Sequence, residues 1–200
     1  HQRPQYINLQ QILDYNKTIA GKHHVSLMLG HENYNTTKVT LEASKKNMFS
    51  IDNLELNGAV IDGQQAASTK GQYNTEGYFA RALYDYDSKI FTSLSYRRDA
   101  SSRFHPDHRW GDFWSAGLGY LINKESWFNA PWVDLLKLKA SVGSQGNDGI
   151  GAYRYTDTYT ISNNEGKIAV SFNTKGNEKI TWETNTNINA GVDFELFGRK

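Results

Sequence analysis

Two pairs of histidines come nearest, by residue type and spacing, to a chemical motif. His105 and His108 enclose a proline and Asp107, and imidazole with carboxylate is a ligand set that suits zinc. The run lies in a polar stretch with no third ligand beside it, which favours a solvated loop over a metal site. His23 and His24 stand next to an expected turn, and the same interpretation applies to them.

The other short motifs are incomplete. Asp85, Asp87 and Asp148 could offer oxygen ligands to calcium, but the regular ligand spacing of a calcium loop is missing. Gly149 and Gly151 lack the third glycine and the strand–helix context of a dinucleotide fingerprint. No Ser–His–Asp or paired-carboxylate arrangement stands out. We therefore expect no catalytic residue, no metal and no cofactor, and the chain is predicted not to be an enzyme.

Composition narrows the fold class. Of the 200 residues, 13% are aromatic, 17 are glycine, 3 are proline and none is cysteine; this favours strands and turns and excludes disulfides and thiolate metal sites. The net charge of +1 implies no nucleic acid as a partner. No stretch approaches the roughly 18 consecutive apolar residues of a membrane helix, whereas a barrel strand needs only alternate apolar residues. The first residues, His1 to Pro4, do not begin a signal peptide, so we expect a cut within a longer chain.

Hydrophobicity alternates with a period of two along much of the chain. In the clearest case, Trp114, Ala116 and Leu118 alternate with Ser115 and Gly117. Successive side chains of a strand point to opposite faces, so this pattern predicts strands with one apolar and one polar face. The expected strands are about Tyr6–Ile19, His23–Asn35, Tyr73–Asp85, Ile90–Arg97, Trp110–Ile122, Leu136–Gln145 and Ile180–Leu196.

The connections between these strands differ in length. Long loops are expected at about 45–72, with local structure near Ile51–Leu56, and at about 146–179, with a hairpin of Tyr155–Ile161 and Ile168–Phe172. In an up-and-down meander the short turns would lie at one end of the sheet and the long loops at the other, as in outer-membrane barrels. The intermediate connector before the sixth strand, Asn123 to Asp134, is expected to hold a helical turn around Trp132–Leu136.

Aromatic and charged residues fit the same geometry. Rings with polar tips prefer the headgroup level of a membrane, so two girdles are expected. The short-turn girdle would hold Tyr84, Tyr86, Tyr120 and Phe194, and the long-loop girdle Tyr78, Trp110, Trp114 and Trp182. Arg98 is expected to reach towards headgroups. The polar face would carry mainly structural charges, namely Arg81, Arg97, Asp99, Lys137, Lys139, Glu183, Asp193 and Glu195.

Five segments together carry a family resemblance. They are YFARALYDYDSKI at Tyr78–Ile90, SLSYRRDASSRF at Ser93–Phe104, RWGDFWSAGLGYLINKE at Arg109–Glu125, LKLKASVGSQGND at Leu136–Asp148 and ITWETNTNINAGVDFELF at Ile180–Phe197. In order and spacing, over most of Tyr73–Phe197, they resemble the SusC/RagA family of TonB-dependent outer-membrane transporters of the Bacteroidetes.

The resemblance implies a fold and a function. Residues 1–200 would be part of one TonB-dependent receptor β-barrel domain, all-β, with about seven strands of a large transmembrane barrel in an antiparallel up-and-down meander. The protein would import nutrients, either glycan oligosaccharides or peptides, across the cell outer membrane. Its partners would be outer-membrane lipid, a SusD-like surface lipoprotein, and TonB through a plug domain that this stretch lacks.

Three loop residues are the candidates for substrate binding. Tyr153, Tyr155 and Tyr159 lie in the second long loop and could stack on sugar rings. The alternative function is that of a secreted β-sandwich glycan-binding module. A sandwich would bury the apolar face of the strands against a second sheet, whereas a barrel would present that face to lipid.

Overall fold

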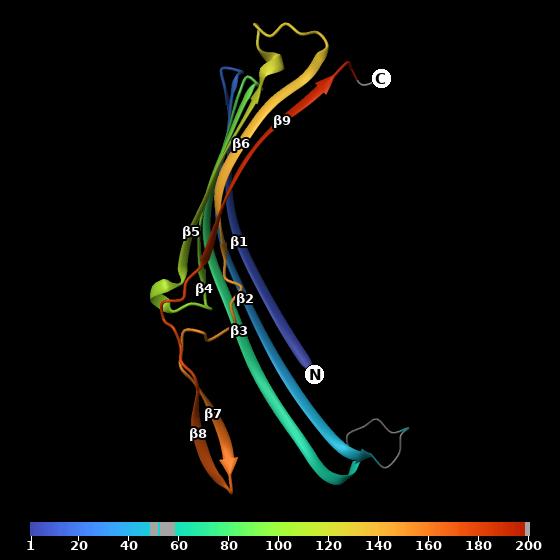
Figure 1. Cartoon of the computed structure of the whole chain (residues 1–200), viewed down its shortest axis with the longest axis vertical. Helices are drawn as coiled ribbons and strands as arrows, with labels where there is room; N and C mark the ends of the chain where they lie inside the picture. The colour runs from blue at the N-terminus through green and yellow to red at the C-terminus, as the bar shows by residue number, and fades with distance from the viewer. Residues whose placement is uncertain (49–51, 53–58, 199–200) are drawn as a thin grey trace. The chain divides into compact units, whose positions relative to one another are not determined.

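The computed structural model describes residues 1–48, 52 and 59–198. Seven strands form one sheet in the order β1-β2-β3-β4-β5-β6-β9, and β7 and β8 form a second, two-stranded sheet (Figure 1). The bounds are β1 Gln2–Ile19, β2 His23–Met48, β3 Ala59–Tyr86, β4 Ile90–Ser101, β5 Trp110–Leu121, β6 Val133–Asn147, β7 Thr158–Asn164, β8 Lys167–Thr174 and β9 Glu183–Leu196, with 3-10 turns η2 Pro106–His108 and η3 Ile122–Lys124. The predicted fold class, a seven-stranded antiparallel meander, is confirmed, although the sheet does not close into a barrel.

Two compact units divide the chain. The first contains residues 1–8 and 34–74, and the second contains residues 9–33 and 75–200. In the first unit, β1 pairs with β2 where the amide of Leu41 donates to the carbonyl of His1 at 2.8 Å. The rings of Tyr34 and Tyr73, from β2 and β3, meet edge to face with their centroids 6.3 Å apart. Among all described residues, no helix is long and apolar enough to cross a membrane.

The strands of the second unit are joined at one end by tight turns. Between β3 and β4, Asp87 and Ser88 both have positive φ, at 53° and 51°. Positive φ at two successive residues is the left-handed backbone of a tight hairpin turn, and three residues, 87 to 89, separate the paired ends Tyr86 and Ile90. The amide of Lys89 closes the turn by donating to the carbonyl of Tyr86 at 2.9 Å. The turn sets the register of β3 on β4, which then runs without a slip from Tyr86 opposite Ile90 to Thr75 opposite Ser101.

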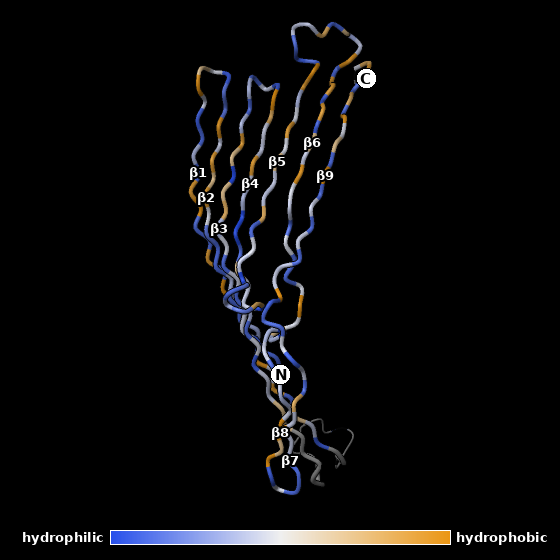
Figure 2. Tube along the Cα trace, turned by 60° about the vertical axis from the view of Figure 1, so that its left-hand side comes forward, coloured by the Kyte–Doolittle hydropathy of each residue, from blue (hydrophilic) through white to orange (hydrophobic). Residues whose placement is uncertain are grey.

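The register separates an apolar from a polar face in the second unit. One row across β3, β4, β5, β6 and β9 holds Ala82, Leu94, Ala116, Val142 and Ile188. The adjacent row on the other face holds Leu83, Ser93, Gly117, Ser141 and Asn189. Figure 2 shows the resulting alternation of hydrophobic and hydrophilic residues along these strands.

The apolar face is exposed. The side chain of Leu94 is 53% exposed and that of Ile188 is 79% exposed. Within the described residues no second sheet covers these side chains, which contradicts the β-sandwich alternative. The polar face carries the charged residues that the alternation predicts for it, such as Lys139 paired with Asp193 at 2.6 Å.

Several predicted boundaries are wrong. The expected loop at 45–72 is mostly strand, because β2 continues to Met48 and β3 begins at Ala59. Strand pairing is held by backbone hydrogen bonds, so it persists through polar residues that show no apolar alternation. The local structure expected near Ile51–Leu56 lies outside the described residues, apart from Asp52.

Two smaller differences concern the later connections. The helical turn expected around Trp132–Leu136 is absent, because β6 already begins at Val133, and a 3-10 turn lies earlier, at Ile122–Lys124. The second long loop contains the predicted hairpin, as β7 and β8, with Tyr159 opposite Phe172. This hairpin lies beyond the loop ends of β4 and β5 (Figure 1).

Candidate functional site

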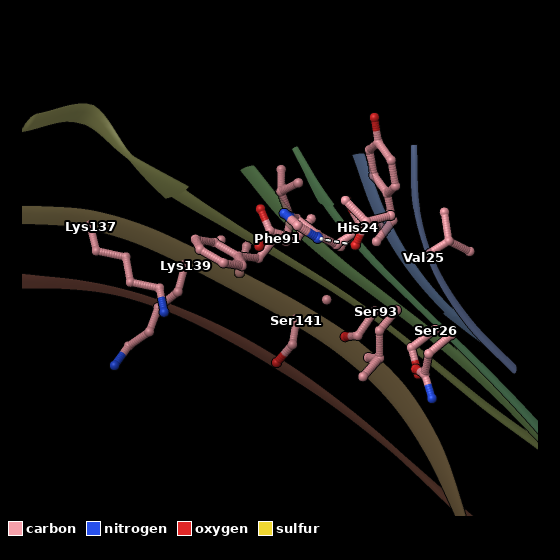
Figure 3. A pocket seen from close by; sticks show the side chains of 18 of the residues that line it. His24, Val25, Ser26, Phe91, Ser93, Lys137, Lys139 and Ser141 are labelled. Carbon is pink, nitrogen blue, oxygen red and sulfur yellow. Dashed lines mark hydrogen bonds between the residues drawn. The ribbon is translucent and has the colours of Figure 1, made fainter. Parts of the chain in front are cut away.

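The polar face is hollowed near the tight turns. The hollow, of about 760 Å³, is lined by residues of β1 to β6 and β9. Figure 3 shows Lys137 and Lys139 at one end of it, with Phe91 beside them and Ser26 and Ser93 towards the other end. The lining therefore mixes hydroxyl groups with apolar side chains, and it carries three lysines, Lys17, Lys137 and Lys139.

Glycines make room for the two lysine stems. A Cβ atom on Gly119 would lie 3.2 Å from Cε of Lys137, and one on Gly191 would lie 2.9 Å from Cε of Lys139. Lys137 places its ammonium 5.4 Å from the centre of the Phe91 ring, a cation–π contact. The lysine stems thus run along the wall of the hollow, and Lys139 ends on the carboxylate of Asp193 at 2.6 Å.

Further along the polar face lies an ion-pair cluster. The Nε atom of Arg97 donates to both oxygens of Asp99 at 2.7 Å. Its NH2 group donates to Glu32 at 3.0 Å, and Gln10 donates to the other oxygen of Glu32 at 3.0 Å. The guanidinium also stands 5.4 Å from the centre of the Phe79 ring. The cluster links β1, β2 and β4, as the structural role expected for Arg97 and Asp99 requires, with one guanidinium shared by two carboxylates.

The buried core lies at the loop end of β4 and β5. Phe104 is fully buried and Phe113 is 8% exposed. The ring of Trp182 packs against both, with centroids 5.5 and 5.2 Å away. The assignment of Trp182 to the long-loop girdle is wrong, because these contacts and a 2.8 Å hydrogen bond from its Nε1 to the carbonyl of Arg109 turn it inward.

Polar contacts hold the same loops together. Ser101 donates to the carboxylate of Asp148 at 2.7 Å, and Arg103 donates to the Asp148 carbonyl at 2.7 Å. Thr181 donates to the carbonyl of His108 at 2.9 Å. Asp148, considered above as a calcium ligand, is thereby a structural tie between the β4–β5 loop and the end of β6. Within the described ranges, no group of three or more His, Asp or Glu residues is arranged to hold a metal ion.

The His-Pro-Asp-His run forms the turn η2. His105 caps the turn by accepting from the amide of Asp107 at 3.3 Å. Its ring also meets the ring of Tyr155 edge to face, with centroids 5.8 Å apart. The His-Pro-Asp-His segment therefore forms a local turn that positions the His105 ring against Tyr155.

Tyr155 is the loop tyrosine that lines a cavity. The cavity, of about 740 Å³, lies between His105 and the segments on either side of the β7–β8 hairpin. Lys175, Lys179 and Asp157 also contribute to it. Tyr153 and Tyr159 do not line this cavity; Tyr153 is 55% exposed and Tyr159 packs against Phe172 with centroids 5.7 Å apart. Of the three candidates, Tyr155 is the one that lines this cavity.

The sequence did not predict that His105 and Gly176 would form this cavity with Tyr155. His105 was considered only as a metal ligand. A Cβ atom on Gly176 would lie 2.6 Å from the carbonyl oxygen of Tyr155, so only glycine allows the two segments to approach. A glycine between two polar residues in a loop is a usable signal of such an approach, although it does not identify the partner segment.

The chain matches one family over nearly its whole length. The family described as "TonB dependent receptor-like, beta-barrel" matches residues 2–200. "TonB-dependent receptor P39" of Formosa agariphila is 30% identical over 200 residues, covering 96% of this chain and 19% of that protein. "TonB-dependent receptor SusC" of Bacteroides thetaiotaomicron is 32% identical over 126 residues, covering 58% of this chain and 13% of that protein.

Solved structures give the same result. "Structure of the RagAB peptide importer in the 'closed-closed' state" superposes with a TM-score of 0.90 at 27% identity, covering 98% of this chain and 22% of that chain. The 'open-open' state of the same importer superposes with a TM-score of 0.88 at the same identity and coverage. The present chain therefore spans about a fifth of the length of the relatives that it matches.

Proposed function

Because this chain belongs to the TonB-dependent receptor-like β-barrel family, we propose that it is a section of the barrel wall of an outer-membrane nutrient importer. The observation that carries this proposal is the exposed apolar face of a single antiparallel sheet whose other face is polar. Exposing such a face to water is unfavourable, whereas contact with the hydrocarbon chains of lipid is not.

The width of the apolar face fits a bilayer. Along β9 the outward residues are apolar from Phe194 to Ile188, and the next, Thr186, is polar. The eight residue-to-residue steps from Phe194 to Thr186 span about 27 Å along the strand, or about 21 Å along the membrane normal at a tilt of about 40°. An outer-membrane barrel carries an apolar band of about 25 Å.

The substrate and partners extend the same proposal. We infer that the whole protein imports oligosaccharides or peptides, with a SusD-like lipoprotein as its surface lid and with energy supplied through TonB at segments outside this chain. A relative named SusC and the RagAB peptide importer support this inference. The hydroxyl-lined hollow and Tyr155 at the loop cavity supply surfaces along which a polar oligomer can move. No chemistry on the substrate is proposed for this section of the wall.

Two adjacent residues test the proposal. The chain has no cysteine, so Ser93→Cys and Leu94→Cys can each be introduced into the full-length protein, in which any cysteines elsewhere are removed. These positions lie on opposite faces at the same depth of β4. We expect the Leu94→Cys variant to react in intact outer membranes only with a lipid-soluble maleimide. The Ser93→Cys variant should react with a small water-soluble one. Equal labelling of both from water would contradict a lipid-facing wall.

A separate experiment tests whether Tyr155 contributes to substrate uptake. Replacing Tyr155 with alanine should lower the rate of oligomer uptake several-fold, while Tyr153→Ala, outside the cavity, serves as the matched control. Uptake that is unchanged by Tyr155→Ala would remove the loop cavity from the transport path and leave the barrel assignment intact.

A further inference from the structure

The two walls of the loop cavity come from different segments of the chain. One wall is His105 with Pro106, in the β4–β5 loop. The other wall is the β6–β9 connection, which contributes residues 155–157 before β7 and residues 175–179 after β8. The rings of His105 and Tyr155 meet across the cavity, with centroids 5.8 Å apart. The width of the cavity therefore depends on how the β6–β9 connection is held against the β4–β5 loop.

The β6–β9 connection leaves and re-enters the large sheet at one point. Asn147, the last residue of β6, lies opposite Glu183, the first residue of β9. The side-chain amide of Asn147 donates to the carboxylate of Glu183 at 3.0 Å. Residues 148–182 thus form an excursion that is closed at its base, so the contacts of its two ends set its orientation.

The first end of the excursion is tied by Asp148. Its carboxylate accepts a hydrogen bond of 2.7 Å from Ser101, which ends β4 and is only 1% exposed. Arg103 donates to the Asp148 carbonyl at 2.7 Å and lies 3.5 Å from the carboxylate, whose side chain is 18% exposed. Hydrogen bonds to an ionised group are short and directional, and exclusion of water strengthens them. The tie therefore fixes the start of the connection to the end of β4 and the loop after it.

The second end is tied by Thr181 and Trp182. Thr181 donates to the carbonyl of His108 at 2.9 Å, and Nε1 of Trp182 donates to the carbonyl of Arg109 at 2.8 Å. The Trp182 ring also packs on the fully buried Phe104, with centroids 5.5 Å apart. Both ends of the connection are thus fixed to the short segment that carries the opposite wall of the cavity.

The two stalks of the connection are also bonded to each other. The amide of Gly176 donates to the carboxylate of Asp157 at 2.7 Å. The amide of Asn177 donates to the carbonyl of Arg154 at 3.0 Å. Because these bonds join the segments before β7 and after β8, the wall that carries Tyr155 moves as one piece.

We propose that Asp148 is a positioning residue for the loop cavity. Its tie, with that of Trp182 at the other end, sets the width of the cavity and holds Tyr155 opposite His105. Asp148 itself does not line the cavity and acts through the backbone that follows it. This inference rests on the proposed function, since the position of Tyr155 matters to uptake only if the solute passes this cavity.

The test measures a distance between two spin labels in the full-length protein. One label is attached at Asp107→Cys, a side chain of the β4–β5 loop that is 80% exposed, and the other at Lys167→Cys, the first residue of β8, with any other cysteines replaced. Neither position lines the cavity. The width of the distance distribution, from pulsed dipolar spectroscopy in outer-membrane vesicles, reports how firmly the wall is held. The control is Glu178→Ala, which removes a carboxylate from the lining of the same cavity.

The wild type and the control should give one narrow distribution. Asp148→Ala and Ser101→Ala should each broaden it about twofold, because a wall with one end released explores more orientations. Since both variants remove the same hydrogen bond, the double variant should be no broader than Asp148→Ala alone. Asp148→Asn keeps an acceptor for Ser101 and should restore most of the narrow distribution.

An unchanged width in Asp148→Ala, or a further broadening in the double variant, overturns the proposal. Ser101→Ala gives the answer if Asp148→Ala does not fold. Failure of the proposed function looks different. If the widths change as expected while Tyr155→Ala leaves uptake unchanged, the tie by Asp148 stands and the transport role of the cavity is refuted.

Discussion

At the scale of single residues, the second unit depends on small side chains that admit large ones. Gly111 and Gly146 both face the ring of Phe113; Cβ atoms there would lie 2.6 and 2.0 Å from its Cζ atom. The same ring packs on Trp182, which ties the end of β6 and the start of β9 to β5. The Phe113 ring is thus packed between residues from three parts of the chain, Gly111, Gly146 and Trp182.

Replacing Gly146 with alanine should destabilise the barrel by about 1–3 kcal/mol, the usual cost of overpacking. The midpoint of heat-induced unfolding, followed as a shift in gel mobility of the full-length protein, measures this. Gly71→Ala is the control, since nothing lies within 4 Å of a Cβ atom there. If Phe113→Leu does not restore part of the loss, the ring contact is not its cause.

The ion-pair cluster gives a second prediction at this scale. Arg97→Met removes the guanidinium that pairs with the Asp99 side chain, which is 15% exposed, and with that of Glu32, which is 21% exposed. Because Arg97 itself is 44% exposed, solvent screening limits the expected loss to about 1–2 kcal/mol. Lys139→Met breaks a pair in which both side chains are more than 40% exposed and should cost less than about 1 kcal/mol. Equal losses in unfolding experiments would argue against a special role for the Arg97 cluster.

At the scale of elements, the tight turns combine backbone and charge. The β3–β4 turn carries Lys89, whose ammonium lies 3.4 Å from Glu125 and 3.6 Å from Asp87. The amide of Leu121 also donates to the carbonyl of Lys89 at 2.8 Å. One residue therefore fastens the turn to the end of β5 and to the connector that follows η3.

The charge of Lys89 predicts a pH dependence. Burial lowers its pKa, but the carboxylates of Glu125 and Asp87 outweigh this, so the net pKa is raised above the ordinary 10.5. The pair therefore contributes stability that is fully present below pH 10.5 and is lost as pH rises through the raised value. The difference in unfolding midpoint between wild type and Lys89→Met should be constant at neutral pH and shrink in strong alkali. A difference that grows with pH would have the wrong sign.

At the scale of the whole molecule, the sheet has two edges and an uncovered apolar face. β1 and β9 stand at the ends of the strand order, each with one side unpaired within the described sheet. Unpaired edges and exposed apolar surface both promote association in water. The sheet therefore needs the neighbouring strands and the lipid that the proposed barrel would supply.

Residues 1–200 expressed alone should accordingly not be a soluble monomer. Size-exclusion chromatography without detergent should give aggregates, and detergent should shift the protein to a defined complex. The full-length protein in the same detergent is the control. A monomeric peak in plain buffer with a sharp two-state melt would refute the expectation.

The alternation of apolar and polar side chains was enough to predict the strands, their two faces and the meander, because a period of two can be recognised from neighbouring residues. The turn at Asp87 and Ser88 could also be predicted from the sequence, since it occupies a few consecutive positions between two alternating segments. Strand ends such as Met48 and Ala59 were not, because backbone pairing continues where side chains carry no pattern.

Only the tertiary structure decided which distant residues meet. Trp182 reads as one more outward aromatic in sequence, yet it bonds to the carbonyl of Arg109, 73 residues away. Glu32 likewise meets Arg97 at a separation of 65 residues. Such contacts follow from register and loop closure across several strands, and no local pattern encodes them. The family fold was therefore visible in the sequence, whereas the buried loop core, the cavity of Tyr155 and the ion-pair cluster of Arg97 required coordinates.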